Sequence, residues 1–384
     1  MWKARLTFGM WLVGAALLYV FTDRYYALVL LLASLSGALG CVVCNLCRRT
    51  VPDVSLHLPP SAAKGEKAEG VLRLANDTAL PMGRVDCTLC EENRLTGERV
   101  SRTVSLRLPG RTAAKLPFLL ESRHGGVVKV FVERLAVRDM LGLSQRVYGA
   151  DVEARCTVFP DTFSPVLAVG TCISMDAEGA EYAPDRPGFD ASETFDIREY
   201  RAGDSPRSIH WKLSAKLERM VVREPGLPVE TSYMFLFEND ASVPAEVRDT
   251  LAEAYCSVVQ ILAAEDICFG MGWTDGQTGL YEQTDIHGSD DLIGAISRLL
   301  DVGASGDADV VRRYLDETGN DYAHVICFAA HVPDSIAELS AKVGHITLFL
   351  CSDESWPEAL YADNVHVVVF TPQNYLRELS YIVI

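Results

Sequence analysis

The chain has 384 residues, 49% of them hydrophobic, and carries 35 Lys and Arg against 52 Asp and Glu, a net charge of −17. This length gives room for two or three domains, and the charge argues against a nucleic-acid-binding protein. The charge is uneven, because residues 224–384 hold 27 acidic and 6 basic residues (6 − 27 = −21), whereas residues 1–223 come to 29 − 25 = +4. We therefore expect the C-terminal part to repel anionic lipid and to attract a basic surface.

The cysteine pattern indicates a reducing compartment. There are eleven cysteines, an odd number, and most lie in apolar runs that are typical of strands. Such a pattern argues against a disulfide framework. Cys87 and Cys90 have the spacing of half a zinc ribbon, but no second pair follows, so we expect buried free thiols there.

Two uncharged apolar runs, residues 6–22 and 25–47, open the chain. At about 1.5 Å per residue they extend for about 25 and 35 Å, enough to cross the hydrocarbon core of a bilayer. Only Asp23 and Arg24 separate them, and no small-x-small cleavage site precedes the second run. The sequence thus predicts a transmembrane helical hairpin over residues 1–49.

Basic residues flank both ends of this hairpin: Lys3, Arg5, Arg48 and Arg49. Under the positive-inside rule both ends lie in the cytoplasm. We therefore expect a two-pass protein of the cell membrane with its soluble domains in the cytoplasm. Neither run contains an ionisable residue, which argues against transport or proton relay.

Residues 50–160 alternate between apolar and polar residues in short runs, which indicates an all-β, Ig-like sandwich. Turn residues such as Pro109-Gly110 and Gly125-Gly126 separate the runs. No catalytic set is present in this segment. The runs are 54–58, 85–89, 104–108, 116–120, 128–132 and 152–158.

Residues 161–227 form a linker followed by a charge-dense stretch. The linker, about 161–190, is rich in Gly, Ala, Pro and Asp and predicts loops. Residues 196–224 carry seven Lys or Arg and five acids around Tyr200, His210 and Trp211. Such a density favours one hydrogen-bonded cluster.

The local chemistry of this stretch predicts a capped helix. Asp204 is placed to cap a helix that begins at Ser205, and Gly203 allows a positive φ before it. On that helix two pairs would each share a face, Arg207 with Trp211 and His210 with Ser214. Before the cap, Arg198 and Arg201 can each bind a carboxylate such as Glu199 or Asp204. MVVRE (220–224) then predicts a strand.

Residues 228–384 alternate apolar strands with amphipathic helices, which predicts a mainly parallel sheet covered on both faces. We expect a hairpin at Asp275-Gly276, a short helix near Trp356 and a helical last segment from Pro372. The expected strands are 231–238, 267–273, 323–330, 345–351 and 365–370; helices are expected at 244–265, from Ser289, around Val310 and from Pro333.

The first of these strands ends in Glu238-Asn239-Asp240-Ala241-Ser242, at the sheet edge where such folds bind ligands. The loop resembles the Asp-x-Ser-x-Ser metal loop of von Willebrand factor A domains, and the strand order with an early hairpin is similar too. The match is degenerate, because Glu238 and Asp240 replace an Asp and a Ser, and Ala330-His331 follows the later strand without an acid. We expect a von Willebrand A-like, Rossmann-type domain without a cofactor; Mg²⁺ at Glu238, Asp240 and Ser242 is the alternative.

The charge-dense stretch resembles the signature of the domain-of-unknown-function 58 family. The similarity rests on Arg198, Glu199, Tyr200, Gly203, Asp204, Arg207, Ile209, His210, Trp211, Lys212, Ser214 and Ala215. A membrane helix pair, a β-rich segment ending near Asp139-Met140-Leu141-Gly142-Leu143 and a von Willebrand A-like domain complete the likeness. The resemblance implies a partnership with a MoxR-type AAA+ ATPase, often beside a membrane transglutaminase-like protein, and no established catalysis.

Three functions stay open for the stretch and the chain. A membrane-anchored adaptor would use the signature either as a partner-binding site or as a lock between domains. A divalent-metal-dependent binding module would use the degenerate loop. A hydrolase would use His210 as base with Asp204 or Glu199, with Ser208 or Ser214 as the available nucleophile. The expected function is the adaptor, without catalytic residues.

Overall fold

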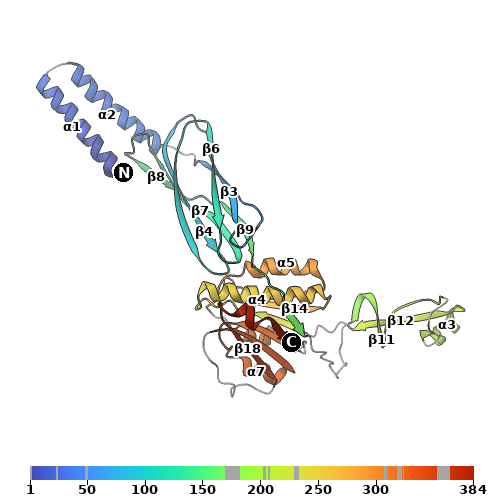
Figure 1. Ribbon diagram of the computed structural model, residues 1–384. Coiled ribbons are helices and arrows are strands. Elements are labelled where there is room, and N and C mark those ends of the chain that lie inside the picture. Colours follow the sequence, from blue (N-terminus) through green and yellow to red (C-terminus); the bar gives the residue numbers. More distant parts are fainter. Residues whose placement is uncertain are drawn as a thin grey trace. The chain divides into compact units, whose positions relative to one another are not determined.

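The computed structural model describes residues 2–22, 25–47, 51–168, 182–201, 205, 208–228, 233–306, 309–317, 322, 324–352 and 364–384. Its backbone divides into two compact units. Unit 1 comprises Met1–Asp161 with the short segments Pro244–Asp249 and Leu300–Ala304. Unit 2 comprises Thr162–Val243, Thr250–Leu299 and Ser305–Ile384. Figure 1 labels the elements of both.

Unit 1 begins with the two predicted apolar helices, α1 (Trp2–Thr22) and α2 (Tyr25–Leu46). Both are long and apolar enough to cross a membrane. The indole N–H of Trp11 donates to Ser34 Oγ at 3.2 Å and so links the two helices. Most of their large apolar side chains are exposed, as expected for helices whose solvent is lipid.

A two-sheet β-sandwich follows, which confirms the prediction for this segment. One sheet has the order β1-β3-β6 and the other β2-β9-β7-β4-β5, with β8 paired to β7. The first sheet contains β1 (Asp53–His57), β3 (Lys67–Asn76) and β6 (Thr112–Glu121). The second contains β2 (Ser61–Ala63), β4 (Met82–Asn93), β5 (Arg99–Leu108), β7 (Gly126–Arg138), β8 (Gln145–Tyr148) and β9 (Glu153–Phe159).

The sandwich core consists of alternate residues from the inner faces of both sheets. Leu72 and Leu74 of β3 share one cluster with Val85 of β4 and Val130 of β7, and all four are fully buried. Burying one such side chain stabilises the fold by about 1.5–3 kcal/mol. The strand β3 is not among the strands predicted from the sequence, although its apolar residues Val71, Leu72 and Leu74 lie between turn residues at its two ends.

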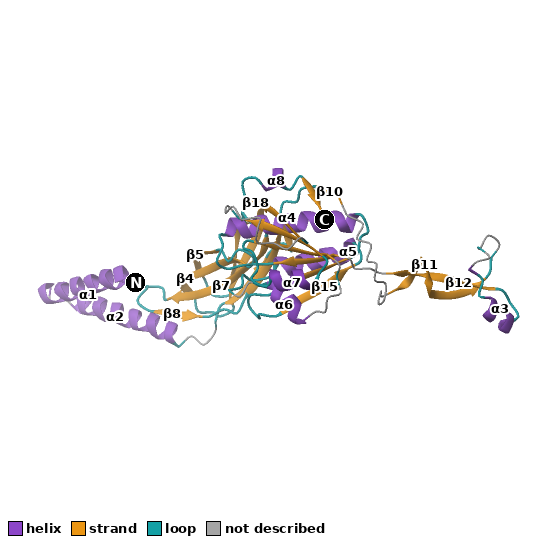
Figure 2. Ribbon diagram, turned by 90° about the horizontal axis from the view of Figure 1, so that it is seen from below, coloured by secondary structure: helices purple, strands orange, loops and turns teal. Residues whose placement is uncertain are grey.

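Unit 2 contains a long antiparallel hairpin of β11 (Tyr182–Glu199) and β12 (Val221–Pro228), with α3 (Trp211–Leu217) at its tip (Figures 1 and 2). The strand expected at 220–224 is confirmed as part of β12. The loops expected over 161–190 are wrong in part, because β10 (Val166–Ala168) is a strand and β11 begins at Tyr182. Residues 169–181 lie outside the described residues.

The centre of unit 2 is a six-stranded sheet in the order β15-β14-β13-β16-β17-β18. All neighbours are parallel except β14 and β15, which form the predicted hairpin. Counted within this sheet the order is 3-2-1-4-5-6, so the direction of winding reverses between β13 and β16. The strands are β13 (Tyr233–Phe237), β14 (Phe269–Thr274), β15 (Tyr281–Ile286), β16 (His324–Ala329), β17 (His345–Cys351) and β18 (Val365–Phe370).

Helices cover both faces of this sheet, as predicted. On one face Tyr255 of α4 meets Phe235 and Phe328 edge-on. On the other face Met234 and Leu236 share a cluster with Tyr314 of α6, beside α7 (Figure 2). The helices are α4 (Ala245–Ala264), α5 (Ser289–Leu300), α6 (Val310–Glu317), α7 (Ile336–Lys342) and α8 (Tyr375–Glu378).

The end of the chain departs from the prediction. Only the short α8 is helical after Pro372, and Tyr381–Val383 form the strand β19, which pairs in parallel with β10. The helix expected near Trp356 lies outside the described residues.

Candidate functional site

The signature residues that the structure describes gather at the tip of the β11–β12 hairpin. Glu199 pairs with Val221 in the hairpin register, and Tyr200 N donates to Met220 O at 3.0 Å. On the opposite edge of β12, Ile209 bridges to Val222. Val221 and Val222 are therefore enclosed on both sides and are almost fully buried.

The predicted start of the helix at Ser205 is wrong. Ser205 is not helical, Ser208 lies in a 3₁₀ turn, and α3 begins only at Trp211. The reason is local pairing, since Ile209 bridges to Val222 and His210 N donates to Val221 O at 2.9 Å, which keeps these two residues out of the helix. Gly203, Asp204 and Arg207 lie outside the described residues, and so does the proposed cap by Asp204.

His210 serves as the cap of α3. Its Nδ1 accepts a hydrogen bond from Leu213 N at 3.3 Å, and its Nε2 lies 2.9 Å from the Arg223 guanidinium. A guanidinium only donates and a neutral imidazole has one acceptor nitrogen, so Leu213 N and Arg223 compete for that one acceptor. His210 and Ser214 do share the helix end, but Ser214 Oγ bonds to the backbone of Val221. This geometry positions a helix and offers His210 no adjacent nucleophile among the described contacts.

The outer surface of the tip combines apolar and basic side chains. None of the α3 residues is buried, and the side chain of Trp211 is 63% exposed. Leu217 and Met220 are exposed as well, beside exposed Lys212 and Lys216. Arg219 reaches Glu199 at 2.6 Å, but both side chains are more than half exposed, so the pair adds little stability. Arg198 donates to the Glu199 carbonyl at 3.2 Å.

A second candidate is the carboxyl end of the sheet in unit 2, where β13 leads into Glu238, Asp240 and Ser242. The Asp240 carboxylate accepts from both Ser242 N and Ser242 Oγ at 2.7 Å, which closes the loop on itself. His331, which follows β16, lies 3.9 Å from Asp240. The carboxyl ends of β13 and β16 thus bring together Asp240 and Ser242, which follow β13, and His331, which follows β16.

Glu238 is 5% exposed, and its Oε2 is buried without a hydrogen-bond partner among the described residues. Burial raises the pKa of this carboxyl well above its usual value, and the neighbouring charges of Asp309, Asp240 and Asp334 raise it further. A protonated carboxylic acid is a poor metal ligand, since metals bind the ionised form.

These donors do not fit a Mg²⁺ site. Both carboxylate oxygens of Asp240 accept hydrogen bonds from Ser242, and burial raises the pKa of Glu238, which disfavours the ionised form that a metal binds. Across the described parts of the chain, no group of three or more His, Cys, Asp or Glu side chains is arranged to hold a metal ion. The loop is therefore a turn closed by its own hydrogen bonds, beside a buried carboxyl group whose pKa is raised.

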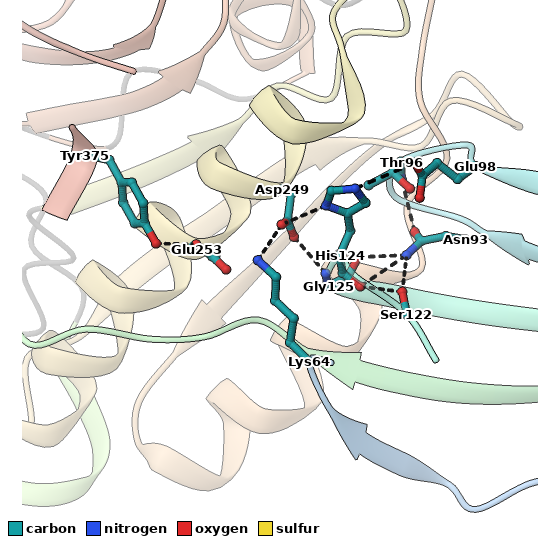
Figure 3. A network of polar contacts seen from close by, with 10 residues as sticks. All are labelled: Lys64, Asn93, Thr96, Glu98, Ser122, His124, Gly125, Asp249, Glu253 and Tyr375. Atoms are coloured by element: carbon teal, nitrogen blue, oxygen red, sulfur yellow. Dashed lines mark hydrogen bonds and ion pairs between the residues drawn. The ribbon is translucent and has the colours of Figure 1, made fainter. Parts of the chain in front are cut away.

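A third polar centre, in unit 1, escaped the sequence reasoning (Figure 3). Asp249, in the first turns of α4, accepts from Lys64 Nζ at 2.6 Å and from Gly125 N at 2.7 Å, and lies 3.0 Å from His124 Nδ1. Asp249 is buried, and its hydrogen bond raises the pKa of His124, with the charge of Glu98 in the same direction. Nearby, Arg94 and Arg155 bind Asp301 at 3.3 and 3.0 Å.

These contacts could not be found from spacing. Lys64 and Asp249 are 185 positions apart, and each stands in an ordinary local context, a turn and a helix. Asp249 lies one helical turn before Glu253, on the side of α4 opposite to Val247 and Leu251, so the apolar spacing of the helix did not mark it. Glu253 is buried too, and in unit 2 it accepts from Tyr375 Oη at 2.8 Å.

Comparisons with known proteins identify neither a family nor a function for this chain. No family model matches the chain, and no curated protein matches it. Among solved structures, the CARDB domain of the PF1109 protein from Pyrococcus furiosus is 13% identical, with a TM-score of 0.21 over 28% of this chain and 88% of that one. A cohesin module of a family 33 glycoside hydrolase from Clostridium perfringens is 8% identical, with a TM-score of 0.24 over 29% and 99%. At such TM-scores these likenesses carry no information on function.

Proposed function

We propose that this chain is a membrane-anchored adaptor that binds a protein partner through the tip of its β11–β12 hairpin, and that it works with a MoxR-type AAA+ ATPase. The observation that carries the proposal is the exposed surface of α3 and its flanks, defined here as Trp211, Lys212, Lys216, Leu217 and Met220. We propose no catalysis by this chain.

Leaving large apolar side chains exposed to water has a free-energy cost that a bound partner would remove. A Trp side chain that is 63% exposed leaves a large apolar area in water, which contributes nothing to folding. Trp is one of the residues that most often anchor protein–protein interfaces, and the lysines beside it would supply electrostatic attraction at the rim. The tip is held rigid beneath by Val221 and Val222, so binding costs little ordering entropy.

The rest of the chain supports an adaptor. The charge of −21 on residues 224–384 would attract a basic surface and speed its encounter. Under this proposal the two helices anchor the body in the cell membrane, and the basic flanks Lys3 and Arg5 place it on the cytoplasmic side. Free thiols such as Cys87, Cys256 and Cys327 suit that reducing compartment.

The partner follows from the family resemblance. The signature, the helix pair and a von Willebrand A-like reading of the 3-2-1-4-5-6 sheet all belong to that likeness. We propose the MoxR-type ATPase as the direct partner and a membrane transglutaminase-like protein as a further member of the assembly.

The test is a salt-titrated pull-down of the full-length chain in detergent with the MoxR-type ATPase encoded beside it. Trp211→Ala should weaken binding at least about tenfold, as expected for an interface anchor. The matched control is Leu280→Ala, because Leu280 is 62% exposed in the β14–β15 turn of the same unit. Absence of binding at every salt concentration, or equal binding by both variants, would contradict the proposal.

A further inference from the structure

The turn between β7 and β8, residues 139–144, is bonded to the ends of both apolar helices. From α1, Arg5 Nε donates to the carbonyl of Leu143 at 3.0 Å. From the last turn of α2, the buried Asn45 donates to Ser144 Oγ at 2.9 Å. One turn of the sandwich therefore contacts the first turn of one helix and the last turn of the other.

A buried carboxylate fixes the shape of this turn. Asp139 Oδ1 accepts from Leu143 N at 2.9 Å, while Oδ2 accepts from Ser144 N at 2.8 Å and from Ser144 Oγ at 2.7 Å. Gly142 has a φ of +72°, which only glycine adopts without strain. The turn is thus ordered before it meets any partner.

Two large apolar side chains project from this ordered turn. Met140 is 61% exposed and Leu141 is 42% exposed. A turn at the surface of a soluble body would normally carry polar residues. Presenting two adjacent apolar side chains on a rigid turn instead favours an apolar or half-apolar environment outside the protein.

The level of the turn follows from the helix lengths. The 21 residues of α1 extend for about 32 Å, close to the hydrocarbon thickness of about 30 Å. Its first residues would therefore lie at the boundary between hydrocarbon and headgroups. Gly142 lies against Ala4, since a Cβ built on Gly142 would be 3.3 Å from that of Ala4. Met140 and Leu141 are thus held beside the boundary.

We propose that Met140 and Leu141 insert into the headgroup region of the bilayer that the two helices span. The proposal rests on the membrane anchoring in the proposed function and adds a third membrane contact. The occupant is lipid: the helix ends bonded to the turn are already at the lipid boundary, and apolar side chains enter headgroups to a depth of about 5–10 Å.

The basic groups around the turn fit this environment. Arg5 lies on one side, and on the other the guanidinium of Arg146 donates to the carbonyl of Leu46 at 2.8 Å. Arg5 uses its Nε–H for the bond to the Leu143 carbonyl and its side chain is exposed, so its remaining N–H groups can meet lipid phosphate. The turn would thereby fix which face of the sandwich is turned toward the membrane.

The experiment places the photoreactive residue benzoylphenylalanine at Met140 in the full-length chain, reconstituted in vesicles of phosphatidylcholine and phosphatidylglycerol. Leu18, 50% exposed in the apolar C-terminal part of α1, is the positive control. Val100 is the negative control, since it is 55% exposed on β5. Through Glu91 and Val130 its register places it eight residues from Arg138, or roughly 26 Å along the strands.

We expect lipid adducts at positions 18 and 140 and several-fold fewer at 100. A label at Leu141 repeats the test in case the first variant does not fold. Adducts at 18 with none at 140 or 141 would overturn the inference and leave the anchor standing. Adducts from 140 to a protein would overturn it in favour of a protein partner. No lipid adducts at any position, including 18, would overturn the membrane anchoring itself and the inference with it.

Discussion

The two charge-rich regions of this molecule, the Asp249 centre of unit 1 and the signature at the hairpin tip, differ in what their charges do. Asp249 is buried, and its carboxylate is bound by an ammonium, an imidazole and a backbone N–H within 3.0 Å. The signature shows an exposed ion pair, Arg219 with Glu199, between exposed side chains. The denser cluster in the sequence is the more exposed one in space.

The difference teaches that charge density along a chain does not report burial. A buried carboxylate needs only a few hydrogen-bond donors, and these come from distant strands. Burying a whole run of neighbouring charges would instead cost the free energy of removing each of them from water. Removing equivalent charges from the two regions is the most direct way to test this comparison.

The largest effect is expected for Asp249→Ala. It removes the buried carboxylate that the Lys64 ammonium and the Gly125 N–H bind, at a cost of about 3 kcal/mol in unfolding free energy. Asp249→Asn keeps an acceptor for Gly125 and should lose less. Denaturant unfolding of the full-length chain in detergent measures both, with the exposed Glu246→Ala as control. Equal stability of Asp249→Ala and the control would contradict the burial of this centre.

Glu238→Gln in unit 2 should raise the thermal midpoint at pH 7. Because the folded state raises the pKa of Glu238, its contribution to stability is fully present below the unfolded value of 4.5 and is lost as pH rises toward the folded value. Glutamine removes that loss at neutral pH. Calorimetry across the pH range should show the gain vanish as pH falls to about 4. A gain that did not depend on pH would point to a cause other than titration.

His124 should make the stability of unit 1 depend on pH in a smaller way. Its folded pKa lies above 6.5, first through its hydrogen bond to Asp249, so its contribution is present below 6.5 and is lost as pH rises through the folded pKa. The variant His124→Asn should flatten this decline in unfolding titrations. His57→Asn, on the exposed end of β1, removes an imidazole outside this centre and serves as the matched control.

Arg219→Ala should have the smallest effect. The pair with Glu199 is exposed, so the thermal midpoint should stay within the change that about 0.5 kcal/mol produces. A loss as large as that of Asp249→Ala would mean that the hairpin tip is buried against another surface, which would sharpen the question of what it binds.

Much of the fold was predictable because it rests on local periodicity. The helix pair, the alternating strands of the sandwich and the order of strands and helices around β13 all follow from apolar spacing. The start of α3 was not predictable, since it depends on the pairing of Ile209 with Val222, which no local sequence pattern shows. The strand β19 was missed because its partner β10 is more than 200 residues away.

The candidate site was predictable only in part. The sequence singled out Trp211, His210 and Ser214, and these do lie together at the hairpin tip. It did not reveal that His210 caps the helix, nor that Asp249 gathers Lys64 and His124, because both depend on contacts formed only in three dimensions.

The parallel pairing of β10 with β19 has a practical consequence. Ile384 N donates to the carbonyl of Ala168, and the Ile384 side chain is buried, so the last residues are stitched to the strand that precedes the hairpin. An affinity tag fused directly after Ile384 would disturb the pairing of β10 with β19 and the burial of Ile384. Purification handles and fluorescent reporters therefore belong on an exposed loop, such as the turn at Gln277-Thr278, if the native body is to be kept intact.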